Sequence, residues 1–139
     1  MKAKHHLIIS LVLALLLYYF TQSLFSFLTI VSGFIIDIDH LLDFWLYKHK
    51  ITMTKEIFNG FHLRWDKAYV FLHSIELLLL FLILSIIKPL WWLPISVGYT
   101  AHMVMDIVAN GAPLRAYFLT YRIAKHFNRT ERGYRFPDE

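Results

Sequence analysis

Apolar residues fill long blocks of this chain, and short polar groups separate the blocks. Residues 7–20 form a nearly continuous apolar block, the polar residues 21–23 interrupt it, and residues 24–36 are apolar again up to Asp37. A single helix over residues 7–36 would be about 45 Å long and would need heavy tilt in a hydrocarbon core of about 30 Å. We therefore predict two short helices that form a hairpin, and one strongly tilted helix is the alternative.

The second half of the chain contains two further apolar blocks, residues 68–87 and 90–109. Each has roughly the twenty residues that a helix needs to cross a bilayer. Lys88 and Pro89 separate the two blocks, and Gly111 follows the second one, as expected where helices end. We predict that both blocks are spanning helices.

Two more segments have the pattern of helices that lie at a membrane surface. Residues 41–50 place apolar side chains at helical spacing with charged side chains between them, and residues 114–127 are aromatic and basic. Residues 51–67 are mixed in composition. We predict one membrane-embedded helical domain, residues 1–127, and a polar C-terminal tail, residues 128–139.

The overall composition supports a membrane protein. Of the 139 residues, 58% are hydrophobic and only 17% are charged, and the mean hydropathy is +0.50. A soluble domain of this size rarely reaches such a value. The sequence therefore predicts an all-α, polytopic membrane bundle with three or four transmembrane helices and additional interfacial amphipathic helices.

The basic residues are distributed unevenly along the chain. The 14 lysine and arginine residues contribute to a formal net charge of +4, and most of them lie in residues 48–67 or from Arg115 onward. The positive-inside rule places both regions in the cytoplasm. These short clusters do not form a basic stripe, so we predict no nucleic-acid partner. We predict a multi-pass membrane protein, with the lipid bilayer as its surroundings and both basic regions on the cytoplasmic side.

Three polar clusters lie in or beside the apolar blocks, near their predicted cytoplasmic ends. They comprise Asp37, Asp39 and His40, then His73 and Glu76, and finally His102 and Asp106. Ionisable side chains inside membrane spans are costly and usually functional. Spacings of three and four residues place the members of the last two pairs on one helix face each.

We predict that these seven side chains form one site that binds one to three divalent cations. Carboxylates and histidines on facing helices are how helical bundles assemble carboxylate-rich metal sites. The chain has no cysteine, so nitrogen and oxygen ligands predict Zn²⁺, with Mn²⁺ or Fe²⁺ as alternatives. We expect the helix to break at residues 37–40 so that its polar side chains surround the ion. For each pair alone, a helix cap or an interhelical hydrogen bond is the alternative.

Several other polar residues have simpler explanations as well. His62 is an additional candidate ligand from the loop. Candidates to bind a substrate phosphate at the interface are Arg64, Lys67 and Arg115, although topology alone also explains them. Four histidines in basic flanks are interpreted as interfacial instead of ligating: His5, His6, His49 and His126.

The three polar clusters resemble the motifs of a family of membrane-bound metal-dependent hydrolases, small inner-membrane proteins of bacteria and archaea. The family has Asp-x-Asp-His at the end of a helix, His-Ser at the start of a later span, and Gly-Tyr-x-x-His-x-x-x-Asp on the last one. The matching segments here are residues 37–40, 73–74 and 98–106. Ile36 stands where the family often has proline, and His62 lies too far upstream to match its His-Arg-Gly motif.

The resemblance implies a metal-dependent hydrolase. A distant likeness of that family to zinc-dependent phospholipase C implies a phosphoester substrate, here a lipid or a lipid-linked compound at the cytoplasmic interface. The metal would activate a bound water, and Glu76 or Asp37 would accept its proton. The alternative is a non-catalytic membrane protein with a structural metal site or an interhelical polar network.

Overall fold

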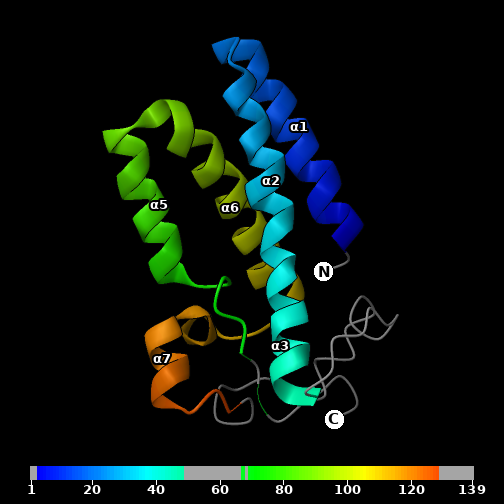
Figure 1. Cartoon of the computed structure of the whole chain (residues 1–139), viewed down its shortest axis with the longest axis vertical. Coiled ribbons are helices and arrows are strands. Elements are labelled where there is room, and N and C mark those ends of the chain that lie inside the picture. Colours follow the sequence, from blue (N-terminus) through cyan, green and yellow to red (C-terminus); the bar gives the residue numbers. More distant parts are fainter. Residues whose placement is uncertain (1–2, 49–66, 68, 129–139) are drawn as a thin grey trace.

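The computed structural model describes residues 3–48, 67 and 69–128 (Figure 1). Its elements, in chain order, are α1 (Ala3–Thr21), η1 (Leu24–Phe27), α2 (Leu28–Ile35), η2 (Ile36–Ile38), α3 (Asp39–Lys48), α5 (Ile75–Ile87), α6 (Pro89–Asn110), η4 (Leu114–Tyr117) and α7 (Leu119–Ala124). The described residues contain one isolated bridge, between Lys67 and Asn128, and no β-strand. The all-α prediction is confirmed.

The first apolar block folds as two helices, as predicted from its length. α1 ends at Thr21, and Gln22 adopts a positive φ of 52°. Ser23 then caps the 3-10 turn η1 by accepting a hydrogen bond from the Phe25 amide. α2, η2 and α3 follow end to end. The expected helix break at residues 37–40 is therefore wrong, because a single 3-10 turn continues the helix there.

α5 is shorter than the spanning helix predicted over residues 68–87. Residues 69–74 are not helical, and α5 begins at Ile75. Ser74 caps the helix by accepting a hydrogen bond from the Leu77 amide. With 13 residues, α5 is about 20 Å long. The sequence prediction failed because these apolar residues fit a helical pattern, whereas tertiary hydrogen bonds hold residues 69–74 in a non-helical conformation.

α6 confirms the helix predicted over residues 90–109, with one extra residue at each end. Gly111 follows it with a φ of 60°, a left-handed conformation that glycine adopts without strain. Because α6 has 22 residues, it is about 33 Å long. It forms the central helix of the bundle, since α1, α2 and α5 all pack against it.

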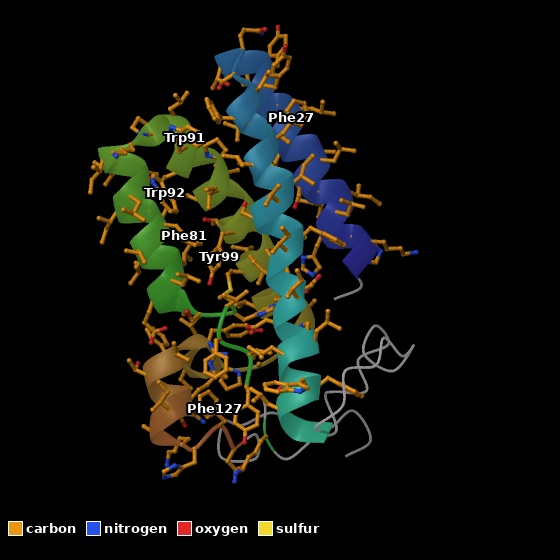
Figure 2. All side chains as sticks on the ribbon, in the orientation of Figure 1. Phe27, Phe81, Trp91, Trp92, Tyr99 and Phe127 are labelled. Atoms are coloured by element: carbon orange, nitrogen blue, oxygen red, sulfur yellow. The ribbon has the colours of Figure 1, made fainter. Side chains whose placement is uncertain are left out.

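The two helical hairpins pack with their turns at the same end of the molecule (Figures 1 and 2). Phe25, beside the first turn, and Trp91, beside the second, have ring centroids 4.1 Å apart. α2 runs closely along α6, and Gly98 permits this approach because a Cβ there would overlap the Thr29 carbonyl oxygen. Close approach through small residues is typical of helix packing in membranes.

The surface of the bundle is more apolar than its interior. Large aliphatic side chains on α1, α2, α5 and α6 are exposed, while the buried described residues include 12 polar or charged ones and only 8 hydrophobic ones. A soluble protein has the opposite distribution. By length and composition, two described helical stretches could cross a membrane, Lys4–Thr21 and Leu24–Leu46.

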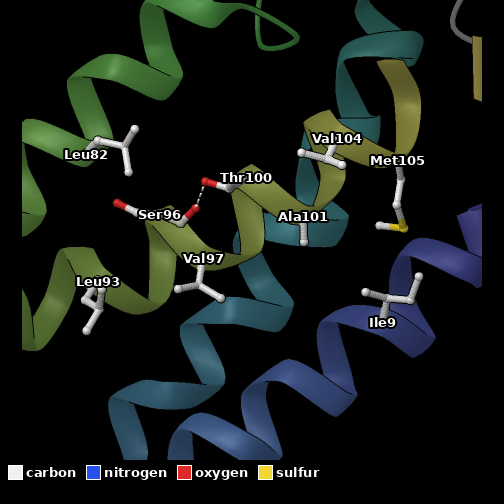
Figure 3. A pocket seen from close by; sticks show the side chains of 9 residues that line it. All are labelled: Ile9, Leu82, Leu93, Ser96, Val97, Thr100, Ala101, Val104 and Met105. Atoms are coloured by element: carbon white, nitrogen blue, oxygen red, sulfur yellow. Dashed lines mark hydrogen bonds between the residues drawn. The ribbon is translucent and has the colours of Figure 1, made fainter. Parts of the chain in front are cut away.

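A cavity of about 470 Å³ lies between α1, α5 and α6 (Figure 3). Aliphatic side chains such as Leu82 and Val97 line most of it. The hydroxyls of Ser96 and Thr100 also border it, but each already donates a hydrogen bond to a backbone carbonyl oxygen, at 2.7 Å and 2.6 Å respectively. The cavity therefore presents hydrocarbon and lacks the ionisable groups that a reaction would need.

Two short helices replace the single helix predicted over residues 114–127. η4 and α7 are separated by Phe118, which is extended with φ −85° and ψ 121°. α7 contributes Arg122, whose side chain is buried. α7 lies at the end of the molecule opposite the hairpin turns, where its Arg122 reaches into the interior (Figure 1).

Candidate metal centre

Four ionisable side chains meet at the end of the bundle opposite the hairpin turns. His73 Nε2 lies 3.1 Å from His102 Nε2 and 3.4 Å from Asp106 Oδ2. His102 Nε2 is also 3.4 Å from Asp106 Oδ2. Asp37 Oδ1 lies 3.7 Å from His102 Nε2 and 4.0 Å from His73 Nε2. These four residues, the central cluster, come from all three predicted groups, which the fold brings together as expected.

The donor atoms of the central cluster have the spacing of metal ligands. Two atoms bound to one ion at about 2.1 Å lie roughly 3.0–3.4 Å apart in octahedral or tetrahedral geometry. His73, His102 and Asp106 meet this spacing and are buried. Two imidazole nitrogens and two carboxylate oxygens suit Zn²⁺, Mn²⁺ or Fe²⁺. The cluster could therefore hold a divalent ion.

Asp37, in the 3-10 turn η2, and His40, at the start of α3, lie at the edge of this cluster. They are three residues apart in a continuous helical stretch, and Asp37 Oδ1 is 3.8 Å from His40 Nε2. The His40 ring lies 4.9 Å from the His73 ring. Both side chains retain 22% exposure. They form the accessible edge of an otherwise buried site.

His73 is carried by the non-helical segment 69–74, which side chains from α6 and α7 hold in place. The Tyr99 hydroxyl donates to the Ser74 carbonyl oxygen at 2.8 Å and accepts from the Ser74 amide at 3.1 Å. The buried Arg122 guanidinium donates to the His73 carbonyl oxygen. These bonds satisfy backbone groups that a buried, non-helical segment would otherwise leave without partners.

Asp39 supports His73 instead of facing the centre of the cluster. Its Oδ2 accepts hydrogen bonds from the amides of Leu72 and His73 and lies 3.3 Å from His73 Nδ1. Asp43, one turn later, accepts from the Tyr69 amide. We predicted Asp39 as a direct ligand, but the structure places it behind a ligand, where it directs His73 Nε2 toward the cluster.

His102 is oriented in a similar way by the backbone of α2. Its Nδ1 lies 2.9 Å from the Gly33 carbonyl oxygen. A carbonyl oxygen only accepts, so Nδ1 carries the proton and Nε2 is left as an acceptor facing the central cluster. Both histidines of the cluster thus present the nitrogen that a metal needs, and both are held by a partner on the other ring nitrogen.

His6 is a member of the site that the sequence interpretation missed. It was assigned to the interfacial flank, but its side chain is buried, with Nε2 3.3 Å from Asp106 Oδ1. Its ring stacks on His102 with centroids 4.0 Å apart. A signal was present in the sequence, because His6, Ser10 and Ala14 recur every four residues on one face of α1, and all three are buried.

Glu76 was predicted as a ligand and as the proton acceptor, and the structure places it elsewhere. Its carboxylate accepts hydrogen bonds from the amides of Leu119 and Thr120, at 2.8 and 2.9 Å, and from the Thr120 hydroxyl. It therefore ties the start of α7 to α5. On one helix, Glu76 would lie beside His73, because residues three apart share a helix face. α5 starts only after His73, so this helical spacing does not apply to the pair.

The remaining candidates are not part of the described cluster. His62 and Arg64 lie outside the described residues. Lys67 and Arg115 are exposed, and their proposed contact with a substrate phosphate stays a prediction.

The carboxylates give the centre a preference for positive charge. Burial lowers the pKa of His73, but hydrogen bonds and charge interactions with Asp106 and Asp39 outweigh it and raise this pKa to about 9. A site that stabilises an imidazolium also attracts a metal cation, which would displace the proton from Nε2.

Comparisons with protein-family models, with curated proteins and with solved structures found no match. The resemblance to membrane-bound metal-dependent hydrolases therefore rests on the three motifs alone.

Proposed function

We propose that this chain is a membrane-embedded, metal-dependent hydrolase that acts on a phosphoester of a lipid or a lipid-linked compound. The observation that carries the proposal is the central cluster, in which two histidine nitrogens and the Asp106 carboxylate lie at ligand spacing and an Asp37 oxygen lies 3.7 Å from His102 Nε2. Such a cluster can catalyse a reaction only if water and substrate can reach it; otherwise its role is structural. Asp37 and His40 supply a partly exposed edge.

The membrane assignment is supported by the exposed aliphatic surface and by the two stretches of spanning length. We propose α6, about 33 Å long, as a third span. α5 would be a fourth, with local thinning of the bilayer to match its shorter length. Because both hairpin turns lie at one end, the N-terminus, α3 and α7 would share the other side. The positive-inside rule makes that side the cytoplasm of an inner-membrane protein.

The residues of the cluster divide the chemical work among them. A bound divalent ion lowers the pKa of its water and polarises a phosphoryl oxygen. Asp37, His73, His102 and Asp106 would hold the ion, while Asp39 and the Gly33 carbonyl oxygen keep the two imidazoles in position. Of the two predicted proton acceptors, Asp37 keeps this role, because it is partly exposed at the edge of the cluster, whereas the Glu76 carboxylate is bonded to the start of α7.

A structural metal site is the second candidate function. His102 and Asp106 are almost completely buried, as the ligands of a closed structural site are. In that case the ion would join α1, α2, α6 and segment 69–74 without performing a reaction. The two candidates differ in whether a coordination position stays open for water.

Metal analysis of the purified protein, combined with hydrolysis assays, tests the proposal. The full chain in detergent should retain zinc or manganese and hydrolyse phospholipids or generic phosphodiesters. His102→Ala should lose both properties, whereas His5→Ala, at an exposed position of α1, should keep both. Bound metal without hydrolysis would favour the structural site. Absence of bound metal in the unaltered protein would refute both.

A further inference from the structure

We propose that this site binds two divalent cations, with His6 as a ligand of the second ion and with Asp106 and Asp37 as carboxylate bridges. The proposal rests on the metal centre proposed above and specifies how many ions it holds. The first ion lies between His73 and His102, and the second lies on the α1 side of the two carboxylates.

Asp106 presents its two carboxylate oxygens to two different sets of nitrogen atoms. Oδ2 is 3.4 Å from both His73 Nε2 and His102 Nε2. Oδ1 is 3.3 Å from His6 Nε2. Each distance is the separation expected for two ligands of one ion. A carboxylate used in this way bridges ions about 3.5–4 Å apart, the spacing of two-metal hydrolytic sites.

Asp37 can form the second bridge. Its Oδ1 faces His73 and His102, while its Oδ2 is shielded from solvent and has no hydrogen-bond partner among the described residues. One ligand atom from each of His6, Asp37 and His102 falls within a 4.8 Å span. This grouping places a carboxylate oxygen of Asp37 near the ion that His6 would bind.

His6 is buried beside the proposed ligands of the first ion. Its side chain is 1% exposed, and its Nε2 lies 3.3 Å from Asp106 Oδ1. Its ring stacks on His102 with centroids 4.0 Å apart. His6 Nε2 is therefore within reach of an ion on the α1 side of Asp106.

A second ion adds a specific capability to the site. His6, Asp37 and Asp106 would supply three ligands, which leaves positions for water or a substrate oxygen. Two adjacent ions stabilise the attacking and leaving oxygens of an in-line displacement at phosphorus. The arrangement therefore favours a phosphoester substrate over a carboxylic ester.

Metal counting on the full chain tests the proposal. Metal-depleted protein in detergent is titrated with Mn²⁺, and bound ions per chain are measured together with the electron paramagnetic resonance spectrum. The unaltered protein should bind two Mn²⁺ ions and show the spectrum of an exchange-coupled pair. His6→Gln should bind one ion with an uncoupled spectrum, and His5→Gln should match the unaltered protein.

The outcomes separate this proposal from its simpler alternative and from the hydrolase proposal. If His6 only orients Asp106 by a hydrogen bond, glutamine can replace it, and the unaltered protein and His6→Gln will both bind a single ion. A single uncoupled ion in the unaltered protein overturns the two-ion proposal even if phosphodiesters are hydrolysed. A coupled pair of ions without any hydrolysis supports the two-ion proposal and refutes the hydrolase proposal instead. The spectrum of the unaltered protein decides the matter even if His6→Gln does not fold.

Discussion

Toward the hairpin turns, the bundle buries hydroxyl side chains, whereas the opposite end buries histidines and carboxylates. Thr29 donates to the Pro94 carbonyl oxygen at 3.0 Å, and Ser96 donates to the Phe81 carbonyl oxygen at 2.7 Å. Each of these bonds joins two helices, and each hydroxyl hydrogen is used within the protein. At the other end, the carboxylates of Asp37 and Asp106 lie beside the ring nitrogens of His73 and His102.

The difference indicates which buried polar groups stabilise the fold and which serve a function. A buried hydroxyl bonded to a carbonyl is a neutral and complete interaction. A buried group of acceptors needs a cation, which is either a proton on His73 or a metal ion. The predictions below separate the two ends of the bundle by removing one group at a time.

Asp106→Asn should have the largest effect, because it removes a charge from the centre and a proposed metal ligand. We expect a loss of about 10³-fold in hydrolysis, equivalent to several kcal/mol of lost charge stabilisation, together with loss of bound metal. Phosphodiester assays and metal analysis measure both quantities. Ser96→Ala, toward the hairpin end, should retain metal and activity. Equal losses in the two variants would mean that Asp106 acts only through stability.

Removal of the metal should destabilise the protein only by weakening the end of the bundle that contains the metal centre. A ligand present at a hundred times its dissociation constant stabilises the folded state by about 2.7 kcal/mol, so a chelator should lower the unfolding temperature in detergent. The chelator should have no effect on Asp106→Asn and its full effect on Thr29→Val. Thermal unfolding that is insensitive to chelation in the unaltered protein would contradict a bound metal.

Asp39→Asn should weaken metal binding by about 10- to 100-fold, the usual effect of losing a partner of a metal-bound histidine. Asparagine keeps the shape but not the negative charge that holds His73 Nδ1. Competition with a fluorescent zinc chelator measures the change. Asp39→Glu, which keeps the charge, is the matched comparison. An unchanged affinity in Asp39→Asn would show that His73 is positioned by other contacts.

The affinity for metal should rise about tenfold per pH unit below pH 9 and then level off. The sign follows from His73, whose raised pKa keeps it protonated below about 9, so that metal binding must release that proton. Metal titrations at several pH values measure the slope. In Asp39→Asn the pKa of His73 should fall, so the levelling should occur at a lower pH. A metal affinity that does not change with pH would show that His73 is not a ligand.

Thr29→Val should have the smallest effect, because it removes one hydrogen bond between α2 and α6 and keeps the side-chain shape. Hydrogen bonds between membrane helices contribute about 0.6 kcal/mol on average, and we expect a loss of that size in unfolding free energy. Metal content should be unchanged. A loss of metal in this variant would show that the two ends of the bundle are coupled through helix packing.

Much of the architecture could be predicted from local patterns in the sequence. The length of the first apolar block required a hairpin, and residues 90–109 carried the signals of a complete helix, as α6 confirms. The spacing of His102 and Asp106 placed both on one face of that helix. The charge pattern placed the polar groups at one end of the bundle. Each of these inferences depends on residues that are close in the sequence.

The composition of the site was decided by tertiary contacts. The Tyr99 hydroxyl and the Arg122 guanidinium hold segment 69–74 in a non-helical conformation, against its helical pattern, and this separates His73 from Glu76. Packing of α1 against α6 brings His6 to Asp106, although a hundred residues lie between them in sequence. Local sequence patterns therefore indicated which histidines and carboxylates could bind a metal and near which end of the bundle they lie. Only the fold decided which of their atoms meet, because hydrogen bonds and packing between distant segments have no local pattern.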